Sequence, residues 1–101
     1  MKIVYKKPEN RTECLDLLKD SILQLHIRFD ATKEYQGIID KLKDVKKSRR
    51  KLYLFQESFL DTLKMSKRNL ILKADLKSLE EMEKRVKIVI KLINHYDRNY
   101  I

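Results

Sequence analysis

The soft or imidazole ligands for a transition metal in this sequence are three side chains, Cys14, His26 and His95. A zinc site needs several such ligands converging at about 2 Å. Cys14 and His26 are twelve residues apart on one predicted helix, hence about 18 Å apart, so they cannot share an ion. Each histidine adjoins an apolar position, and nothing selects a base for the cysteine. We therefore expect no metal, no cofactor and no catalytic residue.

The most strongly charged stretch is KLKDVKKSRRKLYLF at residues 41–55, in which residues 41–51 contain seven cations and one carboxylate. The whole chain has a formal net charge of +9, which attracts anionic partners, either nucleic acid or an acidic protein. Contact with a membrane surface is a third binding role for this stretch. The ordinary alternative is a solvated helix surface, because long cationic side chains often cover such faces.

Two basic groups are the candidate phosphate contacts. The first consists of Lys43, Lys46, Lys47, Arg49, Arg50 and Lys51, and the second of Lys84, Arg85, Lys87 and Lys91. Within one continuous helix, Lys43, Lys47 and Arg50 would form a single outward ridge. The two groups favour nucleic acid if they lie side by side, and a solvated surface if they lie on opposite faces. We expect contacts to the backbone and not to the bases, for DNA and RNA alike.

A second kind of candidate surface is apolar. Five residues fall outside or at the edge of the apolar stripes of the predicted helices, namely Tyr53, Leu54, Leu60, Ile88 and Leu92. Such residues suit contact with another chain, either a protein partner or a second copy in a homo-oligomer. The alternative is a core that extends further around these helices.

The elements that must position these residues are long helices, because the chain has one glycine and one proline. Asn10 and Glu13 have the spacing of a capping box, and the stripe from Leu15 to Phe29 follows, with Cys14 beside it. Asp30 or Thr32 can cap a second helix, whose seam runs from Tyr35 to Leu63 with Arg49 and Gln56 as polar interruptions. A third stripe repeats every seven residues from Leu72 to Tyr100.

The length of the second stripe predicts a break. One helix over residues 32–68 would be about 55 Å long, against about 30 Å for residues 10–30, so its far end would lie in water. Either a partner covers that end or the helix breaks near residues 48–51, which gives four helices. We predict an all-α, antiparallel bundle of three or four helices. The alternative is an α+β fold with short strands, because KIVYK, KLYLF, NLILK and VKIVIKL favour strands.

We expect residues 1–101 to form a single helical domain, with residues 1–8 as an N-terminal arm. The sequence contains no apolar run long enough for a signal peptide or a membrane span, and one cysteine cannot form an intrachain disulfide, which together favour the cytoplasm. The leading interpretation is a non-catalytic accessory protein or small subunit that binds nucleic-acid backbone within a larger assembly. The alternative is a cytoplasmic regulator of another protein, of the immunity, antitoxin or inhibitor type.

Overall fold

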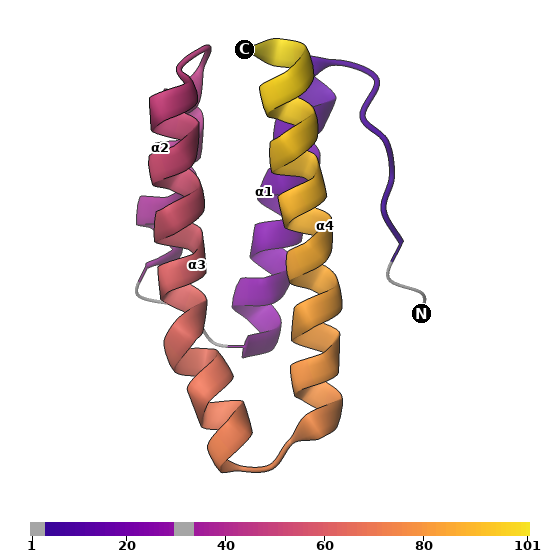
Figure 1. The fold of residues 1–101 in the computed structure, drawn as a ribbon, viewed down its shortest axis with the longest axis vertical. Helices are drawn as coiled ribbons and strands as arrows, with labels where there is room; N and C mark the ends of the chain where they lie inside the picture. Colours follow the sequence, from indigo (N-terminus) through magenta and orange to yellow (C-terminus); the bar gives the residue numbers. More distant parts are fainter. Residues whose placement is uncertain (1–3, 30–33) are drawn as a thin grey trace.

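The computed structural model describes residues 4–29 and 34–101, and these residues form four α-helices and no strand. The helices are α1 (Arg11–Phe29), α2 (Tyr35–Val45), α3 (Arg49–Leu72) and α4 (Leu76–Tyr100). Successive helices run in opposite directions, each packs against the next, and α4 also packs against α1 (Figure 1). The predicted all-α antiparallel bundle is confirmed, and the α+β alternative is wrong for the described residues.

The start of α1 follows the predicted capping spacing. The side-chain oxygen of Asn10 accepts a hydrogen bond from the backbone N–H of Glu13 at 2.8 Å. This bond satisfies one of the amides that a helix start leaves without a partner. The predicted caps of the second helix, Asp30 and Thr32, lie outside the described residues. Before α1, residues 4–10 form a non-helical arm, in the region where an arm was predicted.

The predicted break in the second stripe is present, and it lies at residues 46–48. The chain turns between Val45, the end of α2, and Arg49, the start of α3. Ser48 caps α3, because its hydroxyl accepts from the N–H of Lys51 at 3.2 Å. A continuous helix would have carried Arg49 into the apolar seam, where an unpaired charge is costly. The break leaves that guanidinium exposed.

A second turn separates α3 from α4. The N–H of Asp75 donates to the carbonyl of Leu70, and the N–H of Ala74 donates to that of Ile71, both at 3.0 Å. This pair of bonds is a Schellman motif, in which Ala74, with φ of 54°, occupies the position that glycine usually takes. The third predicted stripe begins at Leu72, and this part of the prediction is wrong because the turn separates Leu72 from α4. Leu72 ends α3 and is 76% exposed, and the stripe reaches the core only further along α4.

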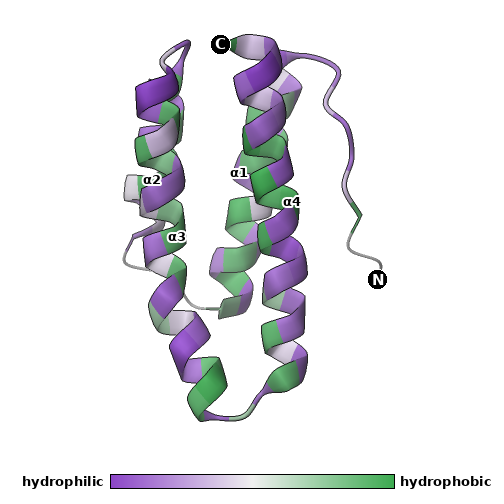
Figure 2. Ribbon diagram, in the orientation of Figure 1, coloured by the Kyte–Doolittle hydropathy of each residue, from purple (hydrophilic) through white to green (hydrophobic). Residues whose placement is uncertain are grey.

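The core lies between all four helices, and Figure 2 shows their apolar residues. Its largest fully buried side chains are Tyr96, Phe55 and Phe59. Cys14 is also buried, and its Sγ lies 3.6 Å from the carbonyl oxygen of Leu92. Burial raises the pKa of the Cys14 thiol to about 11. The expected position of Cys14 beside the apolar stripe is therefore confirmed.

The bundle has two different ends, separated along its 40 Å long axis. At one end the α2–α3 turn, the start of α1 and the end of α4 come together (Figure 1). At the other end the α3–α4 hairpin projects beyond α1. The Ser66 hydroxyl donates to the carbonyl of Phe29, the last residue of α1, at 3.0 Å. The last six residues of α3 therefore extend about 9 Å past that contact.

Candidate nucleic-acid interface

The first basic group forms what we call the basic corner, residues 43–51 between the last turn of α2 and the first turn of α3. All six of its candidate residues are exposed, namely Lys43, Lys46, Lys47, Arg49, Arg50 and Lys51. They do not form the single ridge expected of one helix, because the chain reverses direction at the turn. Lys43 lies on α2 and Arg50 lies on α3, with Lys46 and Lys47 in the connection.

Two cations of the corner are held by carboxylates. The Nε of Arg49 lies 2.8 Å from Asp97 of α4, and the Nζ of Lys51 lies 3.2 Å from Asp44 of α2. The hydrogen bond between Arg49 and Asp97 raises the pKa of the guanidinium above its ordinary value. Within residues 4–29 and 34–101, no carboxylate is in ion-pair distance of the other four cations, Lys43, Lys46, Lys47 and Arg50.

The first turn of α3 concentrates positive charge at the positive end of a helix dipole. It contains Arg49, Arg50 and Lys51 and no acidic residue. The helix dipole disfavours a cation in this position, and it favours an anion for the same reason. Asp44 and Asp97 offset part of the unfavourable potential, since each lies on a neighbouring helix. The potential that remains near Lys47 and Arg50 attracts anions, and helix N-termini commonly bind phosphate.

Lys46 has a strained backbone. Its φ is 47° and its ψ is −112°, a region that glycine enters freely and other residues rarely adopt. Such a conformation costs on the order of 1–3 kcal/mol and persists only when the surroundings hold it. The carbonyl oxygen of Lys46 accepts a hydrogen bond from the hydroxyl of Tyr96, a buried residue of α4. A lysine therefore occupies a position that suits glycine better, with its ammonium group in solvent.

The same tyrosine connects the corner to the start of α1. The Nε of Arg11 donates to the Tyr96 hydroxyl at 3.1 Å. Lys7 lies on the arm four residues before α1, and Arg98 lies in the last turn of α4, at the end of the bundle where the start of α1 meets the end of α4 (Figure 1). We call the basic corner together with Lys7, Arg11 and Arg98 the basic end. These three exposed cations were not among the predicted contacts. The antiparallel packing of the four helices brings them to the same end of the bundle as the corner.

The second basic group lies elsewhere. Lys84 pairs with Glu80 at 3.2 Å and Arg85 pairs with Glu81 at 3.3 Å, while the Nζ of Lys91 lies 5.4 Å from the ring centre of Tyr5. Lys87 precedes Tyr96 by nine residues, which places it about 14 Å from the basic end along α4. Local partners already engage three of the four residues of the second group.

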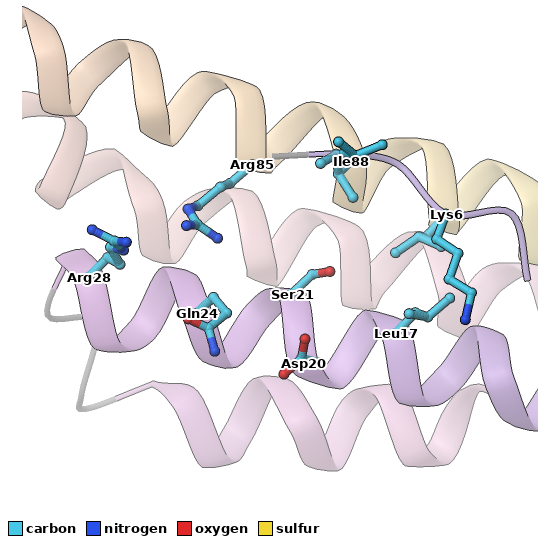
Figure 3. Close-up of a pocket in the computed structure, with 10 residues that line it drawn as sticks. Lys6, Leu17, Asp20, Ser21, Gln24, Arg28, Arg85 and Ile88 are labelled. Atoms are coloured by element: carbon cyan, nitrogen blue, oxygen red, sulfur yellow. The ribbon is translucent and has the colours of Figure 1, made fainter. Parts of the chain in front are cut away.

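A pocket of about 430 Å³ lies between α1, α4 and the N-terminal arm. Figure 3 shows Arg28 of α1 and Arg85 of α4 at one end of this pocket and Lys6 of the arm at the other. Both arginines share one carboxylate oxygen, because Glu81 Oε1 lies 3.4 Å from Arg28 and 3.3 Å from Arg85. Through Glu81, Arg85 therefore takes part in a contact between α4 and α1.

The five apolar candidates divide into two sets. Tyr53, Leu54 and Leu60 are exposed, at 59%, 46% and 36% respectively. Leu92 is buried and Ile88 is partly buried against the core, so the alternative of a wider core describes these two. The proposed contact of Leu92 with a partner is contradicted, because its side chain is only 1% exposed. The reason is that α4 uses this side to pack against α1.

Leu60 lines a shallow groove of about 370 Å³ between α3 and α4. The other apolar residues of this groove are Leu63, Met82 and Val86. The groove is also lined by charged residues, namely Lys64, Lys67, Lys87 and Glu83. The Nζ of Lys67 lies 4.0 Å from Oε1 of Glu83. The groove is thus an apolar surface with a basic margin, separate from the basic end.

The histidines make local aromatic contacts. His26 stacks on Tyr35 with ring centres 4.5 Å apart, and His95 meets the edge of Tyr100 at 5.6 Å. Within the described part of the chain, no three metal-ligating side chains form a cluster that could hold an ion. None of the helices described here combines the length and apolar character needed to cross a bilayer.

Comparisons of the chain with protein-family models, with curated proteins and with solved structures gave no significant match.

Proposed function

We propose that this protein binds the phosphate backbone of nucleic acid through its basic end, as a non-catalytic accessory protein or small subunit of a larger cytoplasmic assembly. The observation that carries the proposal is the concentration of unpaired cations around the N-terminus of α3. Lys46, Lys47 and Arg50 lie there without a carboxylate partner among the described residues. An anion near this helix end relieves an electrostatic potential that Asp44 and Asp97 only partly offset.

Two unfavourable features coincide at this place, which supports a role in binding. The cations of the first turn oppose the dipole of α3, and Lys46 adopts a backbone conformation that favours glycine. Proteins tend to keep such local conflicts where function requires them. Lys7 and Arg11, on the arm and at the start of α1, extend the same charged end.

The expected interaction is weak in sequence preference and strong in salt dependence. Phosphate contacts position a protein on nucleic acid but carry no base identity. About three or four contacts give a slope of roughly −3 in a plot of log affinity against log salt concentration for duplex DNA. Double-stranded and single-stranded ligands share this chemistry, so both belong in the assay.

A matched pair of double variants tests the proposal. Lys47→Glu with Arg50→Glu changes the net charge from +9 to +5, and Lys87→Glu with Lys91→Glu makes the same change on α4. Fluorescence anisotropy with labelled duplex DNA and single-stranded RNA measures the affinity of each. We expect the first pair to lose about tenfold or more and the second to lose much less. Equal losses would indicate a general effect of net charge and would reject a site at the basic end.

The second candidate function is regulation of an acidic protein partner through the groove between α3 and α4. Its supporting observation is the apolar lining around Leu60 with lysines at the margin. An amphipathic helix with acidic residues beside its apolar face would match this surface. Leu60→Glu distinguishes the two functions, because it places a carboxylate in the groove while leaving the basic end intact. Nucleic-acid affinity that persists in this variant supports the first function.

A further inference from the structure

The α3–α4 hairpin ends in an exposed apolar tip, which we define as Ile71, Leu72 and Leu76. Their side chains are 56%, 76% and 73% exposed. Met65, 64% exposed, precedes Leu72 by seven residues and therefore lies on the same side of α3. Figure 2 shows the hydrophobic colour of the ribbon at this extremity. Single exposed apolar residues are ordinary, but a cluster at a protruding end indicates an interaction surface.

The fold does not require apolar residues at the tip. The turn is formed by backbone bonds to Leu70 and Ile71, and the cap of α4 is the carboxylate of Asp75, which accepts from the N–H of Ser78 at 3.1 Å. The tip also lies beyond the contact between Ser66 and the end of α1, so the described part of α1 does not reach it. Polar side chains at residues 71, 72 and 76 would leave these interactions intact.

Cations surround the tip. Residues 64–77 contain five cations and one carboxylate, and the carboxylate is the cap, Asp75. Arg68, Lys73 and Lys77 are exposed on both sides of the turn. An apolar surface with a cationic margin is the combination that binds an anionic bilayer, because apolar side chains enter the boundary between head groups and acyl chains while lysines contact lipid phosphates.

We propose that the tip of the α3–α4 hairpin inserts into the interface of an anionic lipid bilayer, with the bundle standing on the membrane surface. A convex tip of three or four side chains fits a bilayer better than a protein partner, since a stable protein interface needs about 800 Å² on each side. A nucleic-acid backbone is charged and offers no apolar surface for the leucines to contact. The basic end lies at the opposite end of the bundle and stays accessible, so this proposal does not depend on nucleic-acid binding.

The absence of tryptophan from the sequence allows a direct test. Leu72→Trp provides a single fluorescent reporter at the tip, and Leu54→Trp provides a matched exposed reporter earlier on α3. Each is mixed with vesicles of phosphatidylcholine alone or with an equal part of phosphatidylglycerol. We expect emission from Leu72→Trp to shift to shorter wavelength, and to be quenched by brominated lipid, only with anionic vesicles. We expect Leu54→Trp to remain unchanged.

A second variant separates insertion from electrostatic adsorption. Leu72→Ser with Leu76→Ser should reduce vesicle partitioning by about tenfold or more without changing helicity, because both side chains are exposed. Lys47→Glu with Arg50→Glu should leave the fluorescence shift of Leu72→Trp intact. The proposal is overturned if Leu72→Trp shows no shift, or if Leu54→Trp shifts equally. It is also overturned if the shift occurs without vesicles as protein concentration rises, which would assign the tip to contact between copies.

Discussion

The hydroxyl of Tyr96 donates a hydrogen bond to the backbone carbonyl of Lys46, fifty residues earlier in the chain. The tyrosine ring is buried in the core and the lysine side chain is exposed, so this bond links the interior of α4 to the most highly charged turn. Because Arg11 also donates to the same hydroxyl, one side chain orients two parts of the basic end. The geometry of the surface therefore depends on the core.

Tyr96→Phe tests that dependence. The substitution keeps the ring but removes the hydroxyl, leaving the carbonyl of Lys46 without its partner. We expect the free energy of unfolding to fall by about 0.5–1.5 kcal/mol, the usual net contribution of such a bond. Affinity for nucleic acid should fall as well, because the turn loses its anchor. Urea unfolding and fluorescence anisotropy measure the two effects. Tyr53→Phe, which removes an exposed bond to Glu57, is the control and should change neither.

Lys46→Gly should separate stability from binding. Glycine adopts the backbone conformation at residue 46 without strain, so the free energy of unfolding should stay the same or rise by up to about 1 kcal/mol. Binding should weaken, and the salt slope should become shallower by about one unit, since one phosphate contact is lost.

Ala74→Gly is the matched control for Lys46→Gly, because it relieves the other positive φ among the described non-glycine residues, at the opposite end. It should raise stability by a similar amount and leave nucleic-acid affinity unchanged. If Lys46→Gly binds as tightly as the wild type, the lysine side chain is not a phosphate contact.

The Cys14 thiol should be inert and stabilising. Its burial raises its pKa from an ordinary value of 9.0 to about 11. A raised pKa of this kind means that the unfolded chain ionises first as pH increases. The contribution of the thiol to stability is therefore complete below pH 9.0 and is lost as pH rises towards about 11. Cys14→Ala should cost about 1–2 kcal/mol and flatten this part of the pH profile. Rapid reaction of the native thiol with Ellman's reagent would contradict its burial.

Local signals in the sequence predicted most of the fold. The Asn10 and Glu13 spacing marks the start of α1, and the excessive length of the second stripe indicates the break before α3. The sequence does not mark the α3–α4 turn, because Ala74 occupies a position where glycine would be the usual signal. Periodicity alone places Leu72 at the start of the third apolar stripe, whereas its exposure depends on how far the hairpin projects past α1.

The candidate surface was predictable only in part. Charge density alone identifies residues 43–51 as basic, but the pairing of Arg49 with Asp97 depends on a contact between residues 48 positions apart. The same limit applies to Lys7, Arg11 and Arg98, which join the corner only once the direction of each helix is known. Leu92 was assigned to an outer surface because its position on the helix does not reveal which neighbour α4 packs against.

Chemical-shift mapping of the backbone amides by NMR tests the central claim most directly, using a duplex of about 12 base pairs at about 50 mM salt, where phosphate contacts remain strong. We expect the amides of Lys46, Lys47 and Arg50 to shift on titration, together with those of Arg11 and Arg98, and the shifts to disappear as salt is raised. Amides of residues 84–91 should stay in place. Shifts confined to residues 84–91 or to the groove around Leu60, or no shifts at all, would contradict binding through the basic end.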